Sequence, residues 1–339
     1  MYKKLLFIIL PFLLFSCTSN VDEAEVKKAR QFFESVFQDS VLDSPEFQAS
    51  LGYKSNYDKW DDITWQASRQ RAYRAKDDLD YLEKNIDFDK LDENTKISYR
   101  FDFNESRKRN LFLIHGACCD SSVFLGLRDK LLEKFNIMSI DLNGHGKSEG
   151  EGFRSVMDHA FICAELLENK RLGRWDVMGH SLGGAIALTL ALYRPDLIES
   201  LILVATGSRL RIPESFLLEV KKGNNYDLNR EFLKNSVFDG SNDNILTPLL
   251  EIMQSTNPEV VYKDWLAADS FDVSRRLKSI KARCLLICGE NDPLTPLKYH
   301  EHLNSEIPES KLCMFQSCGH WPFIEKPELF LAQLNKFCD

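Results

Sequence analysis

A serine flanked by glycines is the first feature of this sequence that suggests covalent chemistry. The segment GHSLG at 179–183 follows an apolar run, and an Ala- and Leu-rich stretch predicts a helix from about Gly183. A G-x-S-x-G turn between a strand and a helix needs these glycines, because the turn is strained and neighbouring segments come too close for side chains. The turn would expose the Ser181 hydroxyl. The positive end of the helix would favour the negative charge that develops there during acyl transfer.

Two later segments offer the groups that would activate this hydroxyl. A serine is a weak nucleophile until a base takes its proton and a third group orients that base. The apolar run 284–289 is followed by Glu290 and Asp292, and the run 312–315 is followed by His320. We predict His320 as the base and Asp292 as the orienting acid, with Glu290 as the competing carboxylate. The chain order serine, aspartate, histidine is one of the three known triad orders.

The anion that forms when a serine attacks a carbonyl needs backbone N–H donors. One donor should be the N–H of Leu182, directly after the serine. The other should be the N–H of Ala117, in the loop after an apolar run that ends in Ile-His-Gly. His115 and His145 also lie in loops after apolar runs, and we interpret both as loop-shaping residues.

These candidate residues follow short apolar runs that alternate with stretches of helical periodicity, such as 123–135 and 156–172. The alternation predicts an α/β fold, with a mainly parallel sheet covered by helices on both faces. In such sheets ligands bind outside the carboxyl ends of the strands, where the candidate residues lie. The predicted strands are 97–103, 110–115, 137–142, 175–180, 201–205, 284–289 and 312–315.

From residue 97 to residue 339 the motifs resemble the α/β-hydrolase superfamily. They are H-G at 115, D-x-x-G-x-G-x-S at 141, G-H-S-L-G-G at 179, G-x-x-D-x-x-x-P at 289 and G-H at 319, in the family's order and spacing. The resemblance implies Ser181 as the nucleophile, His320 as general base and acid, and Asp292 as the orienting acid. It also implies a helical cap over the active site at about 207–281. Upstream of H-G the family usually has an antiparallel strand pair, whereas here only 97–103 has room for a strand.

The type of nucleophile limits the reactions that the protein could catalyse. Family members that open epoxides or displace halide carry Asp at the elbow, so Ser181 favours acyl transfer to water. The prediction is a serine hydrolase that cleaves a small-molecule carboxylic ester through an acyl-enzyme intermediate. Thioester, lactone and carbon–carbon bond hydrolysis stay open within this class. A catalytically silent surface binding module is the alternative from a different class. The many apolar residues of the cap predict contact with an uncharged acyl group.

Composition argues against several other classes. Hydrophobic residues make up 44% and charged residues 28%, as in soluble globular proteins. The net charge is −8, from 43 Lys and Arg against 51 Asp and Glu, which argues against a nucleic-acid partner. The sequence holds no C-x-x-C pair and no H-E-x-x-H, so it predicts no metal site and no cofactor. Most of the nine cysteines should be free, buried thiols.

The first 17 residues are typical of an export signal. Lys3 and Lys4 precede the apolar run 5–15. As a helix this run would be about 16 Å long against roughly 30 Å of hydrocarbon, too short to span a bilayer. Leu14-Phe15-Ser16-Cys17 resembles the bacterial lipoprotein signal, which implies lipidation of Cys17 and a membrane anchor, with the protein in the periplasm or on the cell surface. The alternative is an ordinary signal peptide and a secreted soluble protein.

Residues 18–96 form a separate, highly charged segment. Apolar residues at three- and four-residue spacing predict two amphipathic helices, near 26–37 and 72–82. The stretch SPEFQASLGYKSNYDKWDDI resembles the opening of a mostly helical family of uncharacterised bacterial secreted proteins, without that family's metal motifs. We expect a structural or partner-binding appendage with no active site. The predicted organisation is a signal peptide at 1–17, the appendage at 18–96 and a hydrolase domain at 97–339.

Overall fold

The computed structural model describes residues 97–338 apart from 105, 108, 224 and 241, together with Lys28, Tyr81 and Lys84. The chain divides into two units, Met1–Thr95 and Lys96–Asp339, and the second is described below. The predicted signal peptide, Cys17 and the two predicted helices of the appendage lie outside the described residues, apart from the isolated positions just named. Within the described part of the chain, no helix is long and apolar enough to cross a membrane.

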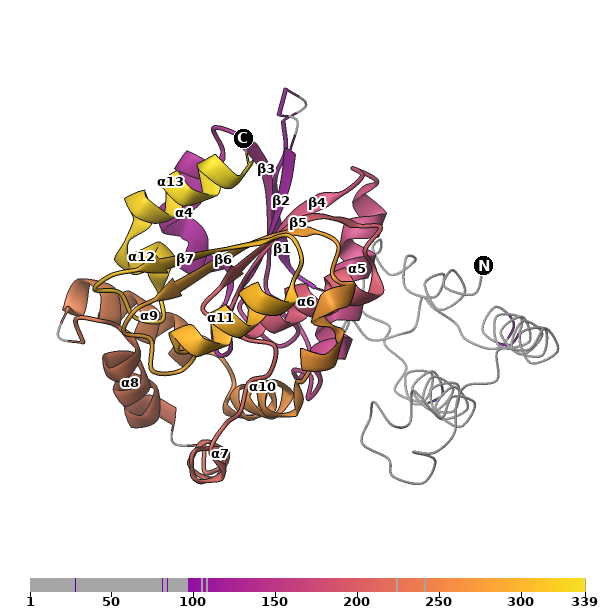
Figure 1. Ribbon diagram of the computed structural model, residues 1–339. Coiled ribbons are helices and arrows are strands. Elements are labelled where there is room, and N and C mark those ends of the chain that lie inside the picture. The colour runs from indigo at the N-terminus through magenta and orange to yellow at the C-terminus, as the bar shows by residue number, and fades with distance from the viewer. Residues whose placement is uncertain are drawn as a thin grey trace. The chain divides into compact units, whose positions relative to one another are not determined.

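The centre of this unit is a seven-stranded sheet with the order β1-β3-β2-β4-β5-β6-β7 (Figure 1). β1 runs antiparallel to β3 at one edge, and every other pair is parallel. Each strand overlaps a predicted one, with ends that differ by up to three residues. The single strand before the H-G segment is β1. The strands are β1 (Tyr99–Asp102), β2 (Arg109–Ile114), β3 (Phe135–Ile140), β4 (Trp175–His180), β5 (Ile198–Val204), β6 (Arg283–Gly289) and β7 (Ser310–Phe315).

Helices cover both faces of the sheet, as predicted (Figure 1). On one face lie α4 (Leu125–Leu131), α12 (Pro322–Glu325) and α13 (Pro327–Cys338), and on the other lie α5 (Val156–Lys170), α6 (Leu182–Tyr193) and α11 (Leu297–Glu306). Alternate strand residues such as Leu111 and Leu113 pack with α4 and α13 in one hydrophobic core. Two faces covered in this way explain why β3 and β4 are buried at every position.

The helix predicted at 123–135 is shorter than its periodicity indicates. The Asp120 side chain accepts a hydrogen bond from the Ser122 N–H and starts a 3₁₀ turn, η3 (Ser121–Phe124), before α4 begins. At the other end β3 starts at Phe135. The side-chain amide of Asn136 donates a hydrogen bond to Asn110 Oδ1, so this polar residue can be buried in the strand. The α-helix is therefore two residues shorter than predicted at its start and four residues shorter at its end.

Between β5 and β6 the chain leaves the sheet and forms four helices, at the place predicted for a cap. They are α7 (Glu214–Lys221), α8 (Asn225–Ser236), α9 (Asp243–Ser255) and α10 (Pro258–Ser270), and the 3₁₀ helix η4 (Ser274–Ser279) leads back to the sheet. An antiparallel bridge between Arg209 and Asp272 closes the base of the insertion. α7–α10 gather below and to the left of the sheet in Figure 1.

The described cysteines match the expectation of free thiols. Eight are described, all are free, and all except Cys313 are buried. Burial raises the pKa of thiols such as Cys284 to about 12, so they stay protonated. They pack as small apolar residues.

Candidate active site

Ser181 occupies a sharp turn between the end of β4 and the start of α6. Its φ of +52° lies in the left-handed region, which is costly for a residue with a side chain. The flanking glycines make the turn possible: a Cβ at Gly179 would lie 2.1 Å from the Gly183 carbonyl oxygen, and one at Gly183 would lie 2.3 Å from the Ile114 carbonyl oxygen. The turn is therefore the predicted strained elbow, with Ser181 half-buried at the carboxyl edge of the sheet.

The turn is also fixed to the next strand, which keeps the serine in place. The Ser181 N–H donates to the Val204 carbonyl oxygen at 2.9 Å. The Ser181 carbonyl oxygen accepts from the Thr206 hydroxyl at 2.8 Å. Val204 ends β5 and Thr206 follows it, so the end of this strand holds the elbow.

Asp292 and His320 meet beyond the ends of β6 and β7. The distance between Asp292 Oδ2 and His320 Nδ1 is 2.8 Å, and both side chains are buried. Asp292 also accepts hydrogen bonds from the Leu294 and Thr295 N–H groups and from the Thr295 hydroxyl. Burial acts to raise the pKa of Asp292, but His320 and these hydrogen bonds hold that pKa well below its usual range. An ionised carboxylate thus orients the imidazole.

The geometry distinguishes Asp292 from its competitor. Glu290 is exposed, and its carboxylate accepts only a long hydrogen bond, 3.4 Å, from the Ser317 N–H. The carboxylate that contacts His320 is that of Asp292.

His180 links the elbow to His320, a role that its sequence context did not indicate. Its Nε2 donates to the His320 carbonyl oxygen at 2.9 Å, and the two rings lie 4.9 Å apart. Burial lowers the pKa of His180 to about 3, so the ring is neutral. Because His180 directly precedes Ser181, this contact ties the loop that carries His320 to the Ser181 turn.

The two segments that carry the predicted oxyanion donors both approach the serine. Leu182 is the first residue of α6, so its N–H has no acceptor within the helix. The loop that carries Ala117 also comes close: a Cβ at Gly116 would lie 3.3 Å from Ser181 Cβ. His115 shapes this loop, as predicted, since its Nδ1 donates to the Gly116 carbonyl oxygen and its Nε2 accepts from the Leu142 N–H.

With the site in view, comparison with known proteins identifies the family. The sequence model of the α/β-hydrolase fold matches residues 109–327, more than half of the chain. The chain belongs to the α/β-hydrolase family. The match includes Ser181, Asp292 and His320.

Relatives of the hydrolase domain include esterases. A pimeloyl-[acyl-carrier protein] methyl ester esterase from Nitrosomonas europaea is 29% identical over 240 residues, 66% of this chain and 93% of the relative. A solved thermophilic esterase is 30% identical with a TM-score of 0.62, over 71% of this chain and 97% of that one. An enol-lactonase from Burkholderia xenovorans, at 20% identity and a TM-score of 0.68, covers 73% of this chain and 97% of its own length, and it shares the fold.

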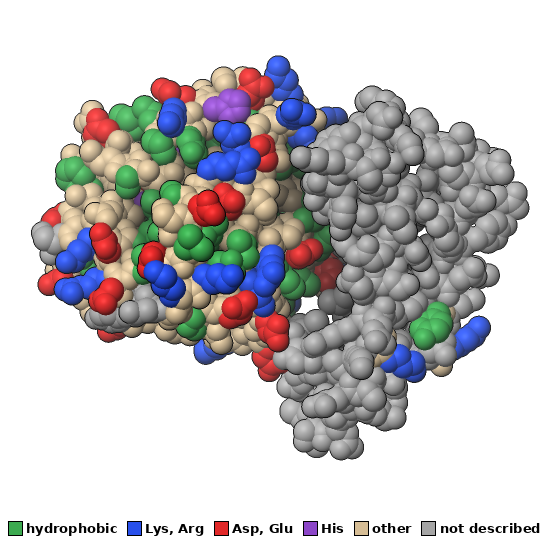
Figure 2. Space-filling model, turned by 90° about the horizontal axis from the view of Figure 1, so that it is seen from below, with side chains coloured by type: hydrophobic (Ala, Val, Ile, Leu, Met, Phe, Trp, Pro, Cys, Tyr) green, Lys and Arg blue, Asp and Glu red, His purple; other side chains and the backbone are tan. Residues whose placement is uncertain are grey.

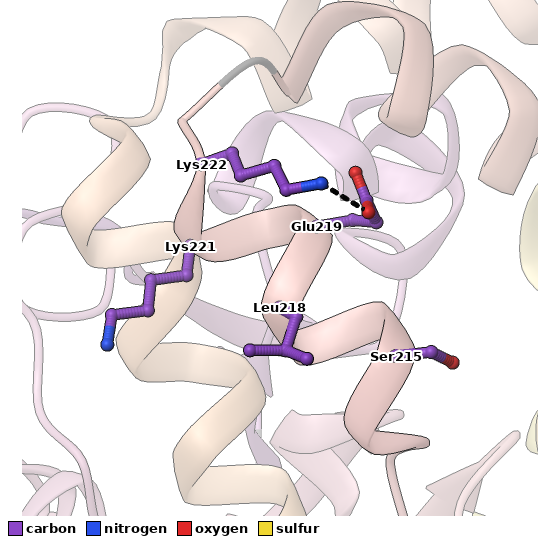
Figure 3. A pocket seen from close by; sticks show the side chains of 5 residues that line it. All are labelled: Ser215, Leu218, Glu219, Lys221 and Lys222. Carbon is purple, nitrogen blue, oxygen red and sulfur yellow. Dashed lines mark hydrogen bonds and ion pairs between the residues drawn. The ribbon is translucent and has the colours of Figure 1, made fainter.

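One surface pocket of this hydrolase lies apart from the candidate residues. It has a volume of about 440 Å³ and is lined by residues of α7 and of the turn that follows it: Ser215, Leu218, Glu219, Lys221 and Lys222 (Figure 3). The Lys222 ammonium and the Glu219 carboxylate form an ion pair of 2.6 Å there. None of the predicted catalytic residues lines this pocket.

Proposed function

We propose that this protein is a serine hydrolase that cleaves uncharged carboxylic esters through an acyl-enzyme. The observation that carries the proposal is the hydrogen-bonded pair of Asp292 and His320 beside the strained Ser181 elbow. Nucleophile, base and orienting acid are the three groups that acyl transfer from a serine requires. The esterase names of the relatives support the same reaction class.

In this mechanism the Ser181 hydroxyl oxygen attacks the ester carbonyl carbon while its proton passes to Nε2 of His320. The carbonyl oxygen becomes an anion that accepts hydrogen bonds from the N–H groups of Ala117 and Leu182. His320 then gives the proton to the departing alkoxide, which leaves as the alcohol. Water attacks the acyl-enzyme with His320 again as the base, and the products are the acid and free Ser181. Asp292 stays ionised throughout and stabilises the imidazolium.

The charge of the cap favours a free ester over an acyl group delivered by an acidic carrier protein. Residues 214–270 hold five Lys and Arg but ten Asp and Glu. On the face shown in Figure 2, acidic and basic side chains are interspersed rather than gathered into a basic area. On this face an acidic partner would find no continuous basic area to bind. The substrate we propose is therefore a small uncharged ester.

Apolar cap residues next to the oxyanion loop are suited to an aliphatic or aromatic acyl group. The rings of Phe216, Phe232 and Trp265 form a trio with centroid distances of 5.0 to 6.4 Å. All three side chains are partly buried and pack against the same core as Ala117. Trp265 directly follows Asp264, whose carboxylate accepts a hydrogen bond from the Cys118 N–H, so the trio lies near the loop that carries the predicted oxyanion donor. Phe271, by contrast, is almost fully buried at the end of α10.

A series of p-nitrophenyl esters tests this proposal. Each added methylene that the trio covers should improve kcat/KM by up to about 0.8 kcal/mol, roughly fourfold, until the site is full. Trp265→Ala should shift the chain-length profile, whereas Phe271→Ala, the matched change in the buried base of the cap, should lower stability and leave the profile unchanged. A flat profile in wild-type protein would contradict selection by the cap. A lack of hydrolysis across the whole series would favour the silent binding module.

We further propose that Cys17 is lipidated and holds the enzyme on a bacterial membrane. The support is the sequence signal, a short apolar run that ends in Leu-Phe-Ser-Cys. Wild-type protein expressed in a bacterium should incorporate labelled palmitate and sediment with membranes, and Cys17→Ala should do neither. Ser16→Ala is the matched control and should behave as wild type, because alanine is also small. Soluble, unlabelled wild-type protein that begins beyond residue 17 would support the ordinary signal peptide.

A further inference from the structure

The residue after the predicted oxyanion donor, Cys118, is held by the cap through both its N–H and its carbonyl oxygen. The Cys118 N–H donates to Asp264 Oδ2 at 2.7 Å, and the Cys118 carbonyl oxygen accepts from the Thr256 hydroxyl at 3.2 Å. Asp264 belongs to α10, and Thr256 ends α9. The cap, rather than the sheet, therefore supplies the side chains that fix this part of the loop.

Cys118 needs such support because its backbone is strained. Its φ is +64°, in the left-handed region that residues with a side chain rarely occupy. The loop relieves this strain if the peptide groups on either side of Cys118 lose their partners, since they can then rotate. The Cys118 N–H belongs to the same planar peptide unit as the Ala117 Cα and carbonyl group, so a shift of that unit would also displace Ala117. The position of Ala117, and with it that of the Ala117 N–H, thus depends on contacts made by the cap.

The carboxylate of Asp264 is itself held in one position by a buried charge. Asp264 and His145 are fully buried, and Asp264 Oδ2 lies 2.8 Å from His145 Nε2. The other ring nitrogen, Nδ1, faces the Asn143 carbonyl oxygen at 3.0 Å. Since both ring nitrogens face acceptors, both must donate, and the ring is a charged imidazolium.

The directions of the pKa shifts agree with an ion pair. Burial acts to lower the pKa of His145, but Asp264 outweighs it and the pKa is raised. Burial acts to raise the pKa of Asp264, but His145 and the Cys118 N–H outweigh it and the pKa is lowered. His145 also lies against the oxyanion loop, since its ring centroid is 5.0 Å from that of His115. The pair is therefore anchored between the cap and two loops at the carboxyl edge of the sheet.

We propose that Asp264 is a positioning residue that couples the cap to the oxyanion hole, so that the Ala117 N–H points at the developing anion only when α10 is seated on the loop. The inference rests on the proposed function and extends it to the cap. Asp264 does not touch the reacting atoms. It acts on the transition state through Cys118 and Ala117, which gives the cap a role in catalysis besides selecting the acyl group.

Replacement of Asp264 by residues of similar size tests this coupling. Asp264→Leu removes the acceptor for the Cys118 N–H and should lower kcat by about 10²-fold, the effect of losing one oxyanion donor, with KM nearly unchanged. Asp264→Asn keeps an acceptor oxygen and should lose less. The affinity for a trifluoromethyl ketone, whose hemiketal oxygen occupies the oxyanion hole, should fall in parallel with kcat/KM across the series. A merely structural role would not produce this parallel.

Asp269→Leu is the matched control on the same helix. The Asp269 carboxylate accepts from the Ile212 N–H within the cap, so its loss should leave kcat and ketone affinity near wild type. Folded Asp264→Leu protein with wild-type kcat, or with a change in KM alone, would overturn the inference. If Asp264→Leu does not fold, Thr256→Val decides, because it removes only the hydrogen bond to the Cys118 carbonyl oxygen.

For Thr256→Val a fall in kcat and in ketone affinity at constant KM supports the coupling, and an unchanged kcat overturns it. Failure of the proposed function gives a different result, since wild-type protein would then hydrolyse no ester. An active wild-type enzyme with unaffected Asp264 and Thr256 variants contradicts the coupling alone.

Discussion

Ser181→Ala should lower ester hydrolysis by about 10⁶-fold in kcat, because no other group can form the acyl-enzyme. A residual rate of about 10³- to 10⁴-fold above water is expected from binding and the oxyanion donors alone. The fold should be nearly unaffected. Alanine at 181 meets the same left-handed strain as serine, and the half-buried hydroxyl is replaced by a small side chain. Kinetics with p-nitrophenyl esters and thermal unfolding measure the two effects separately.

A fluorophosphonate probe gives an independent measurement for the same variant. The probe should label wild-type protein once per chain and should not label Ser181→Ala, because only an activated serine reacts with it. Ser215→Ala is the matched control, since Ser215 lies exposed on α7 and should behave as wild type. Hydrolysis near the wild-type rate in Ser181→Ala would show that the nucleophile is another residue.

The sequence was sufficient to predict the sheet and the elbow because both depend on local patterns. Inner strands covered on both faces, such as β5 and β6, contain continuous apolar runs, and each of the seven predicted strands overlaps a strand of the structure. Glycine on both sides of Ser181 is required by contacts of 2.1 to 2.3 Å that a Cβ would make, so the glycines themselves mark the turn. The parallel order then places the loops that carry Asp292 and His320 at the same edge.

Residues that act across the fold could not be found in this way. Asp264 lies 146 positions from Cys118, in a helix whose carboxylates otherwise resemble those of any solvated helix face. Nothing near it in sequence indicates that it is fully buried against His145. The role of His180 could not be found either, because its hydrogen bond to the His320 backbone spans 140 positions. Local patterns report burial and turns, whereas pairings between distant loops depend on how the cap is seated on the sheet.

The choice between the two carboxylates after β6 also needed the structure, and it yields a second prediction of large effect. Asp292→Asn should lower kcat by about 10⁴-fold, because an amide cannot stabilise the imidazolium and favours the wrong tautomer of His320. The Thr295 and Leu294 N–H groups can still donate to the amide oxygen, so the loop should keep its conformation. Steady-state kinetics beside unfolding measurements would separate the loss of charge from a loss of structure.

Glu290→Gln is the control for this change, two residues away in the same turn. The Glu290 side chain is exposed, and its carboxylate accepts one long hydrogen bond, 3.4 Å, from the Ser317 N–H. The amide oxygen of glutamine can accept the same hydrogen bond. Activity should therefore stay within about twofold of wild type, as for most surface substitutions. The low pKa of Asp292 means that its charge is present throughout the neutral and mildly acidic range, so the difference between the two variants should persist across that range. If Glu290→Gln were the more damaging change, Glu290 rather than Asp292 would be the acid that orients His320 during turnover.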